Sequence, residues 1–118
     1  MSTKSPECYT IDPQARCLRV EISTNRSLLL PLDQFAFAEL ASEDKEQKLR
    51  LVFATHEILI SGHALRKIES AMQRMELASI MSVPVKHQPL IAENQPRIRE
   101  IVVTESESAE VQSRSSLN

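Results

Sequence analysis

One set of side chains in this chain could bind a soft metal ion or act as nucleophile and base: Cys8, Cys17, His56 and His63. Eight residues separate the cysteines and six separate the histidines, whereas zinc ligands usually come in closer pairs. Nucleophilic catalysis requires a thiol of lowered pKa beside a base, and neither cysteine lies in such a setting. We therefore expect no metal, no cofactor and no enzymatic activity. A small enzyme or metal protein built on these four residues is the third-ranked alternative.

The dipeptide His56-Glu57 stands between two apolar runs and could bind a partner protein through a loop tip. Turns are also polar because their backbone groups need hydrogen-bond partners. The favoured interpretation is a polar turn, and His56 and Glu57 stay candidates for partner binding.

A second candidate is the apolar segment 98–103, in which Ile98, Ile101, Val102 and Val103 favour an extended conformation. Such a segment can add as a strand to an exposed sheet edge of the same domain, of a sister subunit or of a partner. It can equally be the last strand of its own domain, because an unpaired apolar strand promotes aggregation. Both interpretations stay open at this point.

The helix-forming part of the chain carries a row of methionines and several cations. Methionines at helical spacing can form an adaptable binding surface, but they more often fill a core. Arg66, Lys67 and Arg74 are most simply a solvated face, with Glu69 and Glu76 at helical spacing to balance them.

Length and charge restrict the class of protein. The chain has 118 residues, 42% of them hydrophobic, which fits one domain with a modest core. The net charge of −2 arises in the tail after Thr104, so the body is neutral and lacks the basic surface of a phosphate-backbone binder. Aromatic residues are also few, and the single glycine argues against a phosphate-binding loop. A small-barrel nucleic-acid-binding protein is therefore ranked second, and nucleic acid is an unlikely partner.

No apolar run reaches the length of a membrane span, and the N-terminal residues lack the apolar core of a secretion signal. We expect a cytoplasmic protein without a membrane partner. In that compartment the two cysteines would be free thiols.

Alternating apolar residues predict a series of short strands. Residues 16–23 alternate cleanly, 27–30 form a short apolar run that ends at Pro31, and 48–53 alternate again. Residues 33–41 suit either a strand or a helix, and we favour a strand paired with 48–53. The inward-facing parity of the apolar residues reverses after Phe53, which predicts either a tight turn at 55–56 or a bulge there. We favour the turn, followed by a further strand over 57–61. Residues 8–13 could add a short edge strand.

Residues 63–81 are expected to form a long amphipathic helix, with Ser61 as a candidate N-cap residue. The predicted organisation is a disordered N-terminus (1–7), a sheet-plus-helix domain (8–83), a proline-containing linker (84–97), the β-prone segment 98–103 and a disordered acidic, serine-rich tail (104–118).

The run from Leu28 to Leu65 resembles a group of small uncharacterised bacterial proteins. The shared features are Leu29-Leu30-Pro31 at a strand end and the segment from Phe53 to Leu65, which reads F-x-x-H-x-[IV]-x-[IV]-x-G-x-x-L. The resemblance implies a sheet that leads into a C-terminal helix.

Together these patterns predict an α+β fold: an antiparallel meander of about five strands, curled or partly barrel-like, with one C-terminal amphipathic helix and a disordered tail. The predicted function is a non-catalytic protein–protein interaction module. We expect a small adaptor or accessory subunit that self-associates or binds a protein partner.

Overall fold

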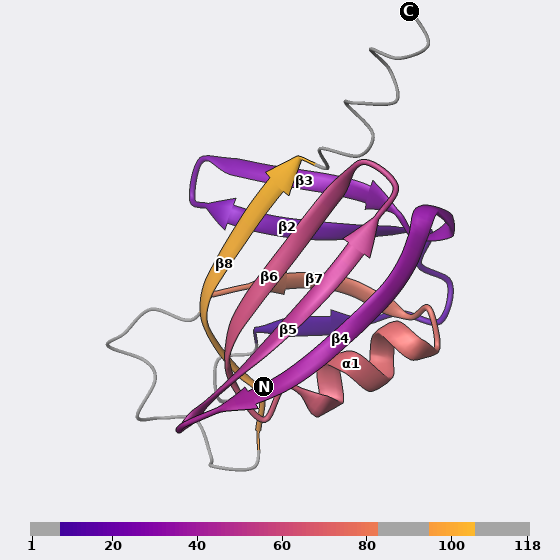
Figure 1. Ribbon diagram of the computed structural model, residues 1–118. Coiled ribbons are helices and arrows are strands. Elements are labelled where there is room, and N and C mark those ends of the chain that lie inside the picture. The colour runs from indigo at the N-terminus through magenta and orange to yellow at the C-terminus, as the bar shows by residue number, and fades with distance from the viewer. Residues whose placement is uncertain (1–7, 83–94, 106–118) are drawn as a thin grey trace, which may run out of the picture.

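The computed structural model describes residues 8–82 and 95–105, which form two four-stranded sheets and one α-helix (Figure 1). The strands of the first sheet, sheet A, are in spatial order β1 (Tyr9–Ile11), β7 (Leu77–Met81), β2 (Cys17–Ser23) and β3 (Arg26–Pro31). The strands of the second sheet, sheet B, are β4 (Phe35–Glu43), β5 (Glu46–Phe53), β6 (His56–His63) and β8 (Arg97–Glu105). A 3-10 turn, Leu32–Gln34, leads into β4, and the helix α1 (Arg66–Gln73) packs against β4 and β7.

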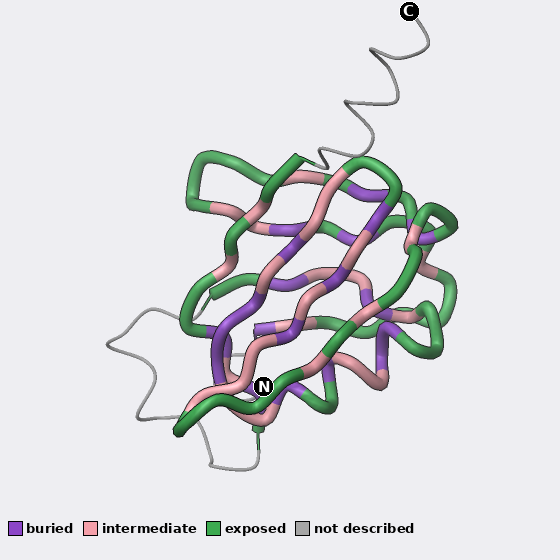
Figure 2. Tube along the Cα trace, viewed as in Figure 1, coloured by how far each residue is buried: buried purple, intermediate pink, exposed green. Residues whose placement is uncertain are grey.

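The two sheets enclose one apolar core because each strand directs alternate side chains inward. Figure 2 shows buried residues at intervals along strands of both sheets and along α1. On β5 and β6 the inward residues pair directly, Leu49 with Ile60 and Leu51 with Ile58. The buried apolar residues are Cys8, Leu18, Val20, Leu30, Leu32, Leu49, Leu51, Phe53, Ile58, Ile60, Leu65, Ile68, Ala71, Met72, Leu77, Ile80 and Ile98.

Several predicted strands are confirmed. Residues 33–41 are extended from Phe35 onward, and β4 pairs with β5 as a hairpin. The reversal of parity after Phe53 is a tight turn between β5 and β6, as predicted, but the turn lies at Ala54 and Thr55, one residue earlier than expected, and His56 already belongs to β6. The short strand expected within 8–13 is β1, at the edge of sheet A.

The predicted single meander of five strands is wrong: the described residues form eight strands in two sheets, which do not close into a barrel. The cause is β7, which lies between β1 and β2 and runs parallel to β2. Parallel neighbours need a long crossover connection. Here the connection contains the strands β3 to β6 and the helix α1, so distant parts of the sequence meet in sheet A.

The predicted helix over 63–81 is also wrong in its bounds, and the helix is not C-terminal, because two strands follow it. It spans Arg66–Gln73. Ala64 has a φ of 55° and Met75 a φ of 58°, so a left-handed residue precedes the helix and another follows it. Ser61 is not its N-cap residue but belongs to β6. The N-cap position is held by Leu65, whose N–H donates to Gln47 Oε1 at 2.8 Å.

A Schellman motif ends the helix. The Met75 N–H donates to the Met72 carbonyl and the Glu76 N–H to the Ala71 carbonyl, each at 2.9 Å. Glycine usually holds the left-handed position of this motif, but here it is Met75, so the sequence carries no stop signal. Leu77 and Ile80 are then fully buried as part of β7.

The segment 98–103 is the central part of β8, which pairs antiparallel with β6 in the same sheet. Ile98 is fully buried opposite Gly62, where the register shifts by a bulge. A Cβ atom on Gly62 would overlap the carbonyl oxygen of Arg97. Glycine is therefore required here by the close approach of two backbones.

The predicted N-terminal segment 1–7 lies outside the described residues. So does most of the linker 84–97 and most of the tail 104–118, of which only the residues up to 105 are described. Within the described ranges no helix is both long enough and apolar enough to cross a membrane.

Replacing Met75 by glycine is expected to stabilise the protein. A left-handed conformation costs a non-glycine residue about 1–2 kcal/mol, and the extra chain entropy of glycine offsets roughly half of that. Met75→Gly should therefore raise the free energy of unfolding by about 1 kcal/mol, measured by urea denaturation. A helix that continued through this position would instead be destabilised by the same substitution.

Replacing Gly62 by alanine is expected to destabilise the protein by about 1–3 kcal/mol, because the added methyl group forces β6 and β8 apart. The control is Ala41→Ser, which also adds one heavy atom but at an exposed position of β4. Equal unfolding midpoints for the two variants in urea would contradict the close approach at Gly62.

Candidate interaction surfaces

The thiol and imidazole side chains do not form one site. Cys8 is buried and its Sγ donates to the Pro96 carbonyl at 3.4 Å, whereas Cys17 is exposed at the start of β2. His56 and His63 stand at opposite ends of β6. Among residues 8–82 and 95–105, no group of three His, Cys, Asp or Glu side chains is placed to hold a metal ion.

His56 and Glu57 begin β6 directly after the turn, and both are half-buried. The His56 ring nitrogen Nδ1 lies 2.7 Å from Thr55 Oγ1. Glu57 accepts a hydrogen bond from Arg50 Nε at 2.8 Å. The two side chains therefore lie in different settings, and Glu57 belongs to the outer face of sheet B.

The four apolar candidates of β8 are divided between core and surface. Ile98 is fully buried, and Ile101 and Val103 pack partly buried against the core. Only Val102 is exposed, at 42% of its surface. Of the four, Val102 alone is available for contact with another molecule.

Val102 is one member of an apolar band that crosses the outer face of sheet B. Val102 pairs with Leu59, and Phe37 pairs with Val52. On β5 and β6, Val52 pairs with Glu57 and Arg50 pairs with Leu59. Each strand contributes two residues that are two positions apart, so Val52 and Leu59 are diagonal neighbours on the same face of the sheet. We refer to Phe37, Val52, Leu59 and Val102 as the outer band.

Arg50 lies within this band and is held on three sides. Its Nε donates to Glu57 at 2.8 Å, its Nη1 donates to Glu39 at 3.3 Å, and its guanidinium lies 5.5 Å from the centre of the Phe37 ring. The hydrogen bond that Arg50 donates to Glu57 and the charges of the two carboxylates raise the pKa of Arg50. An arginine stacked on an aromatic ring and fixed by carboxylates keeps one conformation.

A second ion pair crosses sheet B at its other end. Arg99 on β8 donates two hydrogen bonds to Glu46 on β5, at 2.5 Å and 3.0 Å, and Lys48 lies 3.8 Å from the same carboxylate. The hydrogen bond from Arg99 lowers the pKa of Glu46 despite some opposing desolvation, and the same contact raises the pKa of Arg99.

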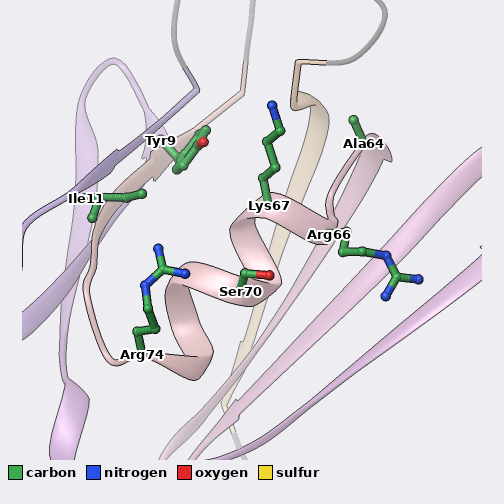
Figure 3. A pocket seen from close by; sticks show the side chains of 7 residues that line it. All are labelled: Tyr9, Ile11, Ala64, Arg66, Lys67, Ser70 and Arg74. Carbon is green, nitrogen blue, oxygen red and sulfur yellow. The ribbon is translucent and has the colours of Figure 1, made fainter.

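A cleft of about 520 Å³ lies between β1 and α1 (Figure 3). The lining residues are Tyr9, Ile11, Ala64, Arg66, Lys67, Ser70 and Arg74. Figure 3 shows Tyr9 and Ile11 on the strand side and Lys67, Ser70 and Arg74 on the helix side, whereas the Arg66 side chain extends away from them. This cleft and the outer band have no residue in common.

The sequence predicted neither the outer band nor the cleft between β1 and α1 as a continuous surface. The outer band follows from the outward positions of four strands, but it can be assembled only when the strand order and register are known. The cleft had a local signal in the spacing of Lys67, Ser70 and Arg74, which places them on one helix face. The sequence alone favours a solvated face for these cations, with Glu69 and Glu76 at helical spacing to balance them. It does not indicate that β1 lies beside the helix.

Replacing Arg99 by glutamine is expected to return the pKa of Glu46 toward its ordinary range. A carboxyl with a lowered pKa in the folded state contributes stability at pH values above the ordinary carboxyl pKa, and this contribution is lost as the pH falls through the lowered value. The measurement is an NMR pH titration of the Glu46 side chain. Lys48→Gln, which removes the more distant cation, should shift the pKa less than Arg99→Gln; an unchanged Glu46 pKa in the latter would contradict the pairing.

No protein-family model matches this chain, and no curated protein or solved structure matches it significantly.

Proposed function

We propose that this protein is a non-catalytic protein–protein interaction module that self-associates through the outer face of sheet B. The observation that carries the proposal is the outer band, a strip of apolar side chains from four neighbouring strands that is exposed at Phe37 and Val102 and half-buried at Val52 and Leu59. Phe37 is 48% exposed and Val102 is 42% exposed, at the two edge strands of the sheet. Contiguous exposed apolar surface marks an interaction site more often than isolated apolar residues do.

The polar residues of the same face support an interface. Arg50 is stacked over Phe37 and paired with Glu39 and Glu57, so its charge is already neutralised before a partner arrives. Aromatic residues and arginine are enriched among the side chains that contribute most to binding. A preorganised arginine also loses little conformational entropy when an interface forms.

A second copy of the chain is the partner that this face fits. In a twofold-symmetric dimer each patch meets itself, so the patch needs both signs of charge beside its apolar part. The outer face of sheet B has both, with Arg50 and Lys48 near Glu39 and Glu57. Two such sheets could pack face to face at the usual spacing of about 10 Å.

Native mass spectrometry and light scattering on the full chain test this proposal. We expect a dimer, and we expect Phe37→Lys and Val102→Lys each to weaken it by roughly tenfold or more, because each substitution places a charge within the apolar part of the interface. The matched control is Leu29→Lys. Leu29 is the most exposed of the large apolar residues described, at 54%, but it lies on β3 of sheet A.

A monomer at all concentrations would contradict self-association. A dimer that Leu29→Lys dissociates, but that the two sheet B variants leave intact, would assign the interface to sheet A instead. Circular dichroism of each variant would show that the fold is retained.

A further inference from the structure

The cleft between β1 and α1 has a charged wall and an apolar wall. On the helix, Lys67, Ser70 and Arg74 follow one another at intervals of three and four residues and therefore lie in one row. The row spans two helical turns, or about 10 Å between the Cα atoms of Lys67 and Arg74. It offers two cationic groups with a hydroxyl group between them.

The apolar wall is formed by β1, with the Tyr9 ring and the Ile11 side chain facing the helix across the cleft (Figure 3). At one end of the cleft, β1 is joined to the turn that follows the helix. The Asp12 N–H, directly after β1, donates at 2.8 Å to the carbonyl of Glu76, which lies three residues after the end of α1 and directly before β7. The end of β1 is therefore held beside the turn that follows α1.

The charges of the cleft differ from those of sheet B. Arg50 and Arg99 are each held by carboxylates through short hydrogen bonds. Arg74 has a longer contact, 3.2 Å, with Glu76. Lys67 makes no ion pair with any other residue in the described part of the chain, although the chain as a whole is slightly acidic. The cleft is thus a local excess of positive charge beside an apolar wall.

We infer that this cleft binds a small organic phosphate with a flat apolar body, of the chemical class of a nucleoside monophosphate. Lys67 and Arg74 would pair with the phosphate and the Ser70 hydroxyl would donate to it, since charge-assisted hydrogen bonds are the strongest that proteins make to such groups. Tyr9 and Ile11 would contact the flat body. The volume of about 520 Å³ lies within the usual range for small-molecule sites. The inference does not depend on self-association through sheet B.

NMR titration of the full chain with adenosine 5′-monophosphate, inorganic phosphate and adenosine tests the inference. The nucleotide should shift the amide signals of β1 and α1 saturably in the low millimolar range or below, and it should bind more tightly than phosphate or adenosine alone. Lys67→Gln should weaken nucleotide binding by roughly tenfold, which corresponds to the loss of one charge-assisted hydrogen bond. Ile11→Ser should weaken binding of the nucleotide but leave inorganic phosphate unaffected.

The control is Arg26→Gln, which removes an exposed cation at the start of β3, outside the cleft. The inference is overturned if neither the nucleotide nor phosphate gives saturable shifts at β1 and α1. It is also overturned if Arg26→Gln weakens binding as much as Lys67→Gln does. Equal affinity for phosphate and nucleotide would overturn the role of the apolar wall. All of the substituted side chains are exposed, so the fold should be retained.

Discussion

The insertion of β7 between β1 and β2 is the constraint on which the rest of this structure depends. Leu77 and Ile80 are fully buried, and Ile80 pairs with Tyr9 of β1 on one side and with Val20 of β2 on the other. The helix therefore has to end before β7 begins, which the left-handed residue Met75 achieves. The short helix is then held beside β1, so the burial of β7 also positions the walls of the cleft.

The outer face of sheet B and the cleft between β1 and α1 differ in how far their cations are paired with carboxylates. On sheet B the cations are neutralised by carboxylates from neighbouring strands, and what remains for a partner is apolar: the outer band. Along α1 the cations are left largely without such partners, and what they face is a tyrosine and an isoleucine. A face with internally paired charge suits a protein partner, whereas a concave surface with an excess of positive charge suits a small anion. One small domain can carry both, because the surfaces lie on different sheets.

The sequence predicted those elements whose signal is local. Leu18 and Val20, like Leu49 and Leu51, alternate with polar residues and lie on strands as expected. The end of the helix could not be predicted, because the position that normally holds glycine holds Met75. The strand order could not be predicted either, because the pairings of β7 with β2 and of β8 with β6 join segments far apart in the chain. Neither candidate surface could be predicted for the same reason. The outer band is formed by several strands, and the cleft is formed by a strand and a helix, so both depend on the strand order.

The central claim, that residues 77–81 form a strand between β1 and β2, can be tested most directly by nuclear Overhauser measurements on the backbone of the full chain. The account predicts cross-strand contacts from Ile80 to Tyr9 on one side and to Val20 on the other, in the registers of an antiparallel and a parallel pair. Sequential amide–amide contacts that continue in a helical pattern from Gln73 through Met81, without those cross-strand contacts, would contradict it.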